Sequence, residues 1–206
     1  MEFPDELKQQ DGTPRVFEHV GFDDLSAGAT VDVPEPPQAN WDAGDGAEAA
    51  VTALYQASAL SLIRLAYIIV GDLASAEDVV QEAFCGLYRR WGRLKNSDGA
   101  LCYVRASVLN GSRSLLRRRA VRRKGLAGEP PAVSAEAVVL RGEEREEVIR
   151  ALRRLPHRQR EVLVLRFYLE LPDEQIARVM GIRPGTVRST AHRAIEALGR
   201  ALQEMS

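Results

Sequence analysis

Apolar residues recur with helical spacing from about residue 47 to the end of the chain, and no stretch keeps the alternation typical of a β-strand. Gly71 follows the first periodic stretch, and Asp72 or Ser75 can cap the helix after it. Residues 92–99 and 125–134 lack the period and are expected to be a loop and a linker. The pattern predicts an all-α fold with helices over residues 47–70, 74–91, 100–119, 143–155, 158–168, 173–180 and 184–202.

Charge divides the chain further. Residues 1–50 carry 12 acids and 2 bases, whereas residues 51–125 carry 13 bases and 5 acids. Five of the ten prolines lie in residues 1–46, so this arm is expected to be disordered. A strongly basic middle favours a polyanionic partner. The predicted division is an acidic arm (1–46), a first helical domain (47–124), a flexible linker (125–142) and a second helical domain (143–206).

Several function classes lack the residues they need. Cys85 and Cys102 form no CxxC pair and the three histidines are scattered, so we expect neither a metal site nor a cofactor. No phosphate-binding glycine loop or nucleophile–base set indicates an enzyme. The chain opens on an acidic segment, and the apolar stretch 60–70 is short and interrupted by Arg64. We therefore expect a cytoplasmic protein that does not insert into a membrane.

The clearest local motif lies in residues 172–202. A short amphipathic helix ends at Gly181, and Pro184 begins a longer helix after a three-residue turn. The apolar residues of the longer helix share one face, and Ser189, His192 and Arg193 lie on the other. This pattern is typical of a helix-turn-helix that places its second helix in the DNA major groove. An ordinary helical hairpin with a charged surface is the alternative.

The helix expected over residues 100–119 carries an aromatic, an amide and arginines at helical spacing. An aromatic ring among guanidinium groups suits unstacked, single-stranded nucleic acid. A solvated basic helix is the alternative. The strip consists of Tyr103, Asn110, Arg113 and Arg117, and it runs into the basic cluster of residues 117–124.

Two blocks of the sequence resemble a known family. Residues 76–84, AEDVVQEAF, resemble the core-polymerase-binding segment of extracytoplasmic-function (ECF) sigma factors. Residues 155–166, LPHRQREVLVLR, followed by QIA at 175–177 and GTVRS at 185–189, resemble the second conserved domain of that family. The resemblance covers residues 47–124 and 143–202 and is nearest to the short actinobacterial branch. It implies an alternative sigma factor that binds core RNA polymerase, recognises the minus-ten and minus-thirty-five promoter elements and promotes promoter opening.

The resemblance also implies roles for individual residues. An acidic face would dock on the coiled coil of the largest polymerase subunit, the second domain would meet the polymerase flap, and the linker would follow the RNA exit path. The implied core-binding residues are Asp78, Gln81 and Glu82. The implied minus-ten residues are Lys95, Asn96 and Ser97 around a flipped base, and Tyr103, Asn110, Arg113 and Arg117 along the opened strand. The implied minus-thirty-five residues are Arg183, Thr186, Arg188, Ser189, His192 and Arg193.

Some features depart from that family. Thr190 stands where many relatives have arginine and Arg183 where a capping serine is common, so promoter preference is expected to differ. The loop 95–99 is not a close match, and the acidic arm lies outside the family pattern. The arm could cover the basic domain, bind a regulator such as an anti-sigma factor, or only solvate the chain.

A stand-alone helix-turn-helix regulator is the other function that the sequence allows. Such proteins usually dimerise on paired half-sites. No second apolar stripe for a symmetric interface is evident, so no homo-oligomer is expected.

Overall fold

The computed structural model describes residues 45–94, 97–125 and 143–205, and the regular structure within these ranges is entirely helical. The all-α prediction is therefore confirmed, while residues 1–44 of the expected arm and 126–142 of the expected linker lie outside the described residues. The elements are α3 (Asp45–Val70), α4 (Leu73–Arg90), a 3-10 turn (Trp91–Arg93), α5 (Ser97–Gly125), α6 (Glu143–Arg154), α7 (His157–Leu163), a π-helical turn (Val164–Tyr168), α8 (Asp173–Met180) and α9 (Pro184–Gln203).

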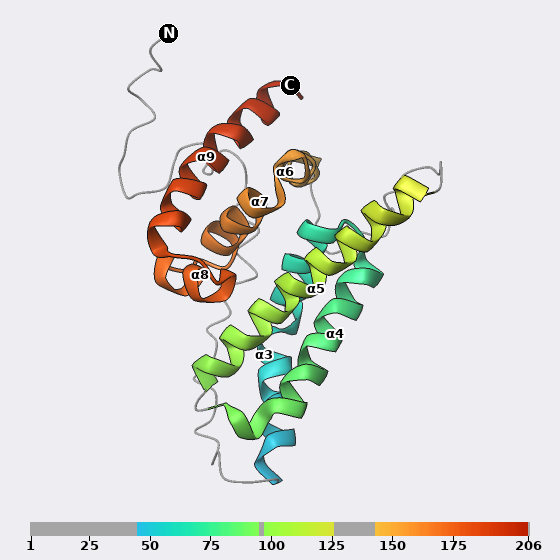
Figure 1. Cartoon of the computed structure of the whole chain (residues 1–206), viewed down its shortest axis with the longest axis vertical. Coiled ribbons are helices and arrows are strands. Elements are labelled where there is room, and N and C mark those ends of the chain that lie inside the picture. The colour runs from blue at the N-terminus through green and yellow to red at the C-terminus, as the bar shows by residue number, and fades with distance from the viewer. Residues whose placement is uncertain (1–44, 95–96, 126–142, 206) are drawn as a thin grey trace.

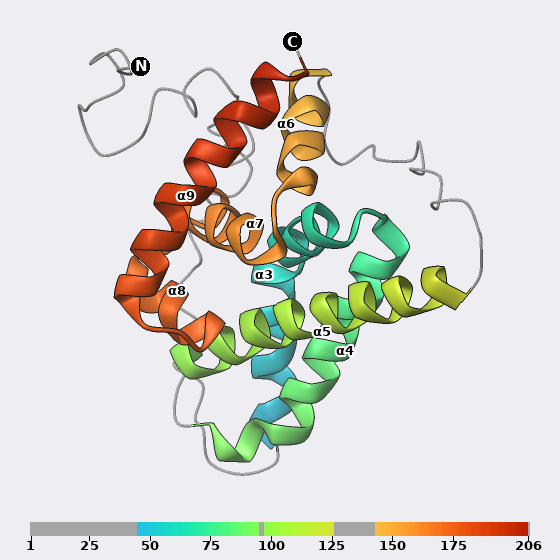
Figure 2. The same cartoon turned by 45° about the horizontal axis from the view of Figure 1, so that its top comes forward.

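Helices α3, α4 and α5 pack against one another as one group, with α5 crossing in front of α3 in Figures 1 and 2. The amphipathic pattern of α4 explains its orientation, because Val80, Phe84 and Leu87 are buried while Asp78 and Gln81 are exposed. The most deeply buried side chains of α3 are Leu62, Leu65, Ala66, Ile68 and Ile69.

Helix α3 is also long and apolar enough over Gly46–Val70 to cross a membrane, judged by length and composition alone. Half of the most apolar 18-residue window in that stretch is buried inside the protein, as is common for the central helix of a bundle. The apolar residues of α3 are therefore explained by the core that it forms with α4 and α5.

The turn between α3 and α4 follows the sequence prediction. Gly71 has a positive φ of 98°, a conformation that side chains with a Cβ rarely adopt, and α3 ends there. Of the two candidate caps, the structure selects Asp72, whose carboxylate accepts a 2.9 Å hydrogen bond from the backbone N–H of Ser75.

Helices α6 to α9 form the second group. Helix α8 ends at Gly181 in the left-handed conformation, and Pro184 is the first residue of α9. The inner face of α9 is buried through Val187, Ala191 and Leu198. The short helix, glycine turn and longer helix expected from residues 172–202 are all present.

Several helix boundaries differ from the sequence prediction, and α5 also ends later than expected, at Gly125 instead of residue 119. Helix α5 begins at Ser97, so the loop expected over residues 92–99 is shortened from both sides by α5 and the 3-10 turn. Packing explains the earlier start of α5, since Ala100 is fully buried and tertiary contact outweighs the poor helix propensity of Gly99. The single helix expected over residues 158–168 ends as α7 at Leu163 and continues as the wider π-helical turn.

The two groups are in contact with each other. Helix α5 packs on α8, and α3 packs on α6 and α7 (Figure 2). The sequence predicted a flexible connection and no such packing. This contact affects one of the candidate DNA-binding residues, as described below.

Candidate nucleic-acid interface

The outward face of α9 is exposed along its first three turns. Its donors are partly held by local contacts, because Arg193 Nε donates to the Ser189 carbonyl at 3.1 Å and His192 Nδ1 lies 3.4 Å from Glu196 Oε1. Contacts of this kind between exposed groups are weak, so the side chains are available to a ligand. All six residues that the resemblance assigned to the minus-thirty-five element are exposed: Arg183, Thr186, Arg188, Ser189, His192 and Arg193.

An acid at the start of α8 orients this face. Asp173 forms an ion pair with Arg166 of the π-helical turn, and its second oxygen lies 3.3 Å from Arg188 Nε. A carboxylate in the first turn of a helix is also favoured by the helix dipole. Asp173 therefore links the π-helical turn, α8 and α9, and pairs with the exposed side chain of Arg188.

Thr190 lies on the opposite side of α9. Its side chain is only 8% exposed and belongs to the face that packs against the other helices. The position that departs from many relatives thus contributes to packing, and a direct effect of Thr190 on promoter preference is not supported. The departure at Arg183 lies at an exposed position, immediately before α9.

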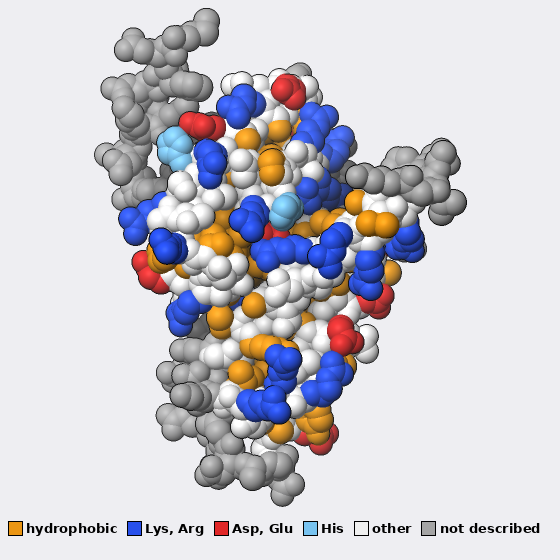
Figure 3. Space-filling view, viewed as in Figure 1, with side chains coloured by type: hydrophobic (Ala, Val, Ile, Leu, Met, Phe, Trp, Pro, Cys, Tyr) orange, Lys and Arg blue, Asp and Glu red, His pale blue; other side chains and the backbone are white. Residues whose placement is uncertain are grey.

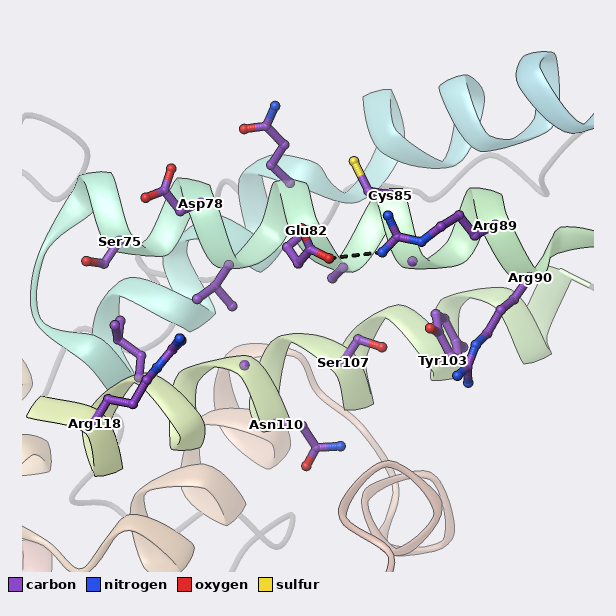
Figure 4. A pocket seen from close by; sticks show the side chains of 16 residues that line it. Ser75, Asp78, Glu82, Cys85, Arg89, Arg90, Tyr103, Ser107, Asn110 and Arg118 are labelled. Atoms are coloured by element: carbon purple, nitrogen blue, oxygen red, sulfur yellow. Dashed lines mark hydrogen bonds and ion pairs between the residues drawn. The ribbon is translucent and has the colours of Figure 1, made fainter. Parts of the chain in front are cut away.

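On α4 the three candidate polymerase-binding residues, Asp78, Gln81 and Glu82, are all exposed. Glu82 accepts a 2.9 Å hydrogen bond from Arg89, which lies seven residues further along the helix (Figure 4). Both partners are mostly exposed, at 76% and 63%, so the pair is worth less than about 1 kcal/mol. A stronger ligand can therefore displace Arg89 from Glu82.

A groove of about 820 Å³ runs between α4 and α5 (Figure 4). The α4 side carries the acids and, further along, Arg89 and Arg90, and the α5 side carries Tyr103, Ser107 and Asn110. Two glycines let the helices approach, because a Cβ on Gly111 would lie 3.0 Å from Val79 Cγ1 and one on Gly86 would lie 3.1 Å from the Tyr103 hydroxyl. The candidate polymerase-binding residues and two of the candidate minus-ten residues, Tyr103 and Asn110, thus lie on the two walls of one groove.

The aromatic of the α5 strip is half-buried against α4. The guanidinium carbon of Arg90 lies 5.8 Å from the centre of the Tyr103 ring, within the range of a cation–π contact (Figure 4). Further along the same helix, Asn110 and Arg117 are exposed. Tyr103 therefore presents a ring beside a fixed positive charge at one end of the strip.

Arg113 is the member of the strip whose surroundings differ most from the sequence prediction. Its Nε and Nη2 donate to Glu161 of α7 at 2.7 and 2.6 Å, and its Nη1 donates to Asn110 at 3.1 Å. The Glu161 side chain is fully buried, and its hydrogen bond raises the pKa of Arg113 above the ordinary arginine value. In this conformation Arg113 binds a carboxylate of the second helical group.

The basic end of α5 contains one arginine with a structural role. Arg119 donates to the Asp72 carboxylate at 2.7 Å, to the Ser75 hydroxyl at 2.6 Å and to the Val70 carbonyl at 3.0 Å. Arg117, Arg118 and Arg122 of the same cluster border a hollow further along the helix. Figure 3 shows Lys and Arg side chains in a band across this face, over α5 and the adjoining second group.

The predicted base-binding loop is only partly described. Lys95 and Asn96 lie outside the described residues, and Ser97 is the first residue of α5. Their assignment to a flipped base stays a prediction.

Sequence reasoning missed the residues that join the two helical groups. Arg160 is 9% exposed and donates to the carbonyls of Ile69 at 2.8 Å and Leu152 at 3.0 Å. Burial lowers the pKa of Arg160, and the nearby charge of Arg153 lowers it further. The available signal was the pair Arg160–Glu161 directly before the apolar run 162–165, since charges in an apolar segment require partners.

Comparisons with known proteins agree with this geometry. The family "Sigma-70 region 2" matches residues 54–122, and the family "Sigma-70, region 4" matches residues 145–198. The chain is 34% identical over 167 residues to the ECF RNA polymerase sigma factor SigL of Mycobacterium tuberculosis, covering 77% of this chain and 93% of that protein. It is 30% identical over 142 residues to the RNA polymerase sigma-E factor of Streptomyces coelicolor, covering 69% and 80%.

A solved structure shares the fold. The sigma factor RpoE of Bartonella quintana, in complex with the anti-sigma factor NepR, superposes with a TM-score of 0.59 at 21% identity, over 73% of this chain and 96% of that chain. In this chain, the match to Sigma-70 region 2 falls on the first helical group and the match to Sigma-70 region 4 falls on the second. This chain belongs to the extracytoplasmic-function family of RNA polymerase sigma factors.

Proposed function

We propose that this alternative sigma factor binds core RNA polymerase through α4, the minus-ten element through α5 and the minus-thirty-five element through α9. The observation that carries the proposal is the groove between α4 and α5, where exposed acids face an aromatic and polar strip. Asp78 and Glu82, at one end of the α4 wall, would repel DNA and suit a protein partner, whereas the strip on α5 has the composition of a nucleic-acid site. A stand-alone regulator has no need of the acidic wall.

The docking residues on α4 are Asp78, Gln81 and Glu82, and their partner is the coiled coil of the largest polymerase subunit. Their exposure and their position on one helix suit a helix-on-helix contact. The flap of the polymerase is the proposed partner of the second helical group.

The opened minus-ten strand would lie along α5. Tyr103 offers a ring for base stacking, and Asn110, Arg113 and Arg117 follow it along the helix with amide and guanidinium donors. Lys95, Asn96 and Ser97 would hold a flipped base at the start of the strip. Extruding that base costs a few kcal/mol, which contacts with the opened strand offset.

The minus-thirty-five duplex would accept the N-terminal half of α9 in its major groove. Arginine, serine and histidine donors on the exposed face are suited to base edges and phosphates. The proposed readers are Arg183, Thr186, Arg188, Ser189, His192 and Arg193, of which Arg188 pairs with Asp173.

The proposal includes a cytoplasmic location and no catalytic activity, cofactor or metal. Its functional units are the arm (1–46), the polymerase- and minus-ten-binding unit (47–124), the linker (125–142) and the minus-thirty-five-binding unit (143–206). The arm, with its excess of acids, would cover the basic first unit or bind a regulator. An anti-sigma factor is a candidate regulator, since the solved relative was crystallised with one.

Binding to purified core polymerase tests the docking surface. Glu82→Lys and Gln81→Ala are expected to weaken core binding at least tenfold and to leave the helical content unchanged. Glu48→Lys, an equal charge reversal at an exposed site on α3, is the matched control and should bind as the native chain does. Native affinity in Glu82→Lys and Gln81→Ala would refute this docking face.

A further inference from the structure

Glu161 occupies the Nε–Nη2 edge of Arg113, and Asn110 takes one N–H of Nη1. The carboxylate accepts from Nε and Nη2, and Nη1 is bound to the Asn110 amide oxygen. A phosphate or a base edge bound side-on through Nε and Nη2 would need the same nitrogen atoms in the same directions. Arg113 therefore cannot bind Glu161 and a DNA strand in this manner at the same time.

Other contacts reinforce the packing that brings Glu161 to Arg113. Arg160, the neighbour of Glu161, donates to the Ile69 carbonyl at 2.8 Å. The guanidinium of Arg153 lies 4.9 Å from the centre of the Tyr67 ring and donates to the Tyr67 carbonyl at 3.3 Å. Residues of α6 and α7 thus bind both α3 and α5, and the second helical group is held on the first.

We propose that this packing is a closed, autoinhibited state in which Glu161 competes with opened promoter DNA for Arg113. The proposal rests on the minus-ten role of Arg113 proposed above. Side-on minus-ten binding through Arg113 then requires the second group to leave α5, and the free chain binds opened minus-ten DNA weakly until that happens. Core polymerase would stabilise the open state, since its contacts with α4 and with the second group differ between the two states.

The burial of Glu161 makes this competition effective. A fully buried carboxylate interacts with its partner in a weakly screened environment, so ordinary salt concentrations do not release Arg113. Breaking the pair without a replacement leaves a buried charge unpaired. The closed state therefore persists in the absence of a partner.

The distance between the two groups is the first test and needs neither DNA nor polymerase. Cys85 is exposed on α4, and Arg200 is exposed on α9, so nitroxide labels on Cys85 and on an Arg200→Cys substitution, in a Cys102→Ala background, report the separation. The native chain should give one narrow distance distribution, and Glu161→Gln should broaden it and shift it to longer distances. Glu174→Gln, which removes an exposed acid from α8, should leave it unchanged.

Affinity for a fork-junction minus-ten template without core polymerase is the second test. Glu161→Gln should raise this affinity at least about fivefold, and Arg153→Ala should raise it as well because it loosens the same packing from the α3 side. Adding Arg113→Gln to Glu161→Gln should abolish the gain. If Glu161→Gln does not fold, Arg153→Ala supplies both measurements.

Three results would overturn the competition: an unchanged distance in both variants, an opened pair of groups without a gain in affinity, or a gain that survives Arg113→Gln. Failure of the proposed function has a different signature. In that case the labels separate as predicted, but no variant binds the fork even with core polymerase present.

Discussion

Arg119 and Asp72 connect the distal part of α5 to the turn between α3 and α4 through a 2.7 Å ion pair. Asp72 uses its other oxygen to cap α4 through the Ser75 N–H at 2.9 Å. Replacing Asp72 by alanine is expected to lower the free energy of unfolding by about 1–2 kcal/mol, because the cap and the ion pair are lost together. Urea denaturation measures the change. Asp78→Ala, at an exposed site on the same helix, should change stability by less than about 0.5 kcal/mol.

The same carboxylate predicts a dependence of stability on pH. Burial acts to raise the pKa of Asp72, but hydrogen bonds from Ser75 and Arg119 outweigh it, and the pKa lies below its ordinary value of 3.8. A carboxyl with a lower pKa in the folded state stabilises the fold above its unfolded pKa, and this stabilisation disappears as pH falls through the folded pKa. The stability difference between the native chain and Asp72→Asn should be constant from about pH 7 to 5 and shrink below about pH 4. A difference that grows in acid would contradict this assignment.

Gly111 predicts a steric effect between α4 and α5. A Cβ there would lie 3.0 Å from Val79 Cγ1, which is closer than side chains normally approach. Gly111→Ala should therefore cost about 1–3 kcal/mol of stability, and Val79→Ala in the same chain should recover part of it. Gly199→Ala, inside α9 with open space around the added methyl, should instead stabilise by about 0.5–1 kcal/mol. Thermal and urea unfolding of the three variants would show whether the close approach of the helices or the loss of a glycine alone decides the change in stability.

The exposed face of α9 predicts a change in salt dependence. Arg193→Ala should weaken binding of the full chain to a minus-thirty-five duplex and, if Arg193 contacts a phosphate, reduce the slope of log affinity against log salt by about 1. Arg200→Ala removes an equal charge from the far end of the same helix and should leave affinity and slope close to native. Equal losses in both variants would mean that the face acts through general charge and not as a recognition helix.

Most of the fold was predictable because its determinants are local. Gly71 and Gly181 adopt the positive φ that their positions after a helix suggested, and Pro184 begins α9. The buried and exposed faces of α4 and α9 also follow from spacing alone, since 3.6 residues complete a turn. Exposure of the candidate polymerase and minus-thirty-five residues follows from the same pattern.

The packing between the two helical groups could not be predicted in this way. Arg113 and Glu161 are separated by 48 positions, and Arg160 reaches a carbonyl 91 positions away. Helical periodicity shows which face of a helix is apolar or polar, but it does not identify the partner that covers a polar face. Arg119 illustrates the same limit, because nothing local distinguishes it from its arginine neighbours, yet it alone of Arg117, Arg118 and Arg119 pairs with Asp72.

Promoter-dependent RNA synthesis by core polymerase is the direct measure of a sigma factor. Run-off transcription with purified core polymerase, fragments of the source genome and the full chain should yield transcripts that start at discrete sites and disappear without the chain. Glu82→Lys should abolish these transcripts, and Glu48→Lys should not. Absence of any chain-dependent transcript, together with tight and specific duplex binding by the chain alone, would contradict the role in initiation.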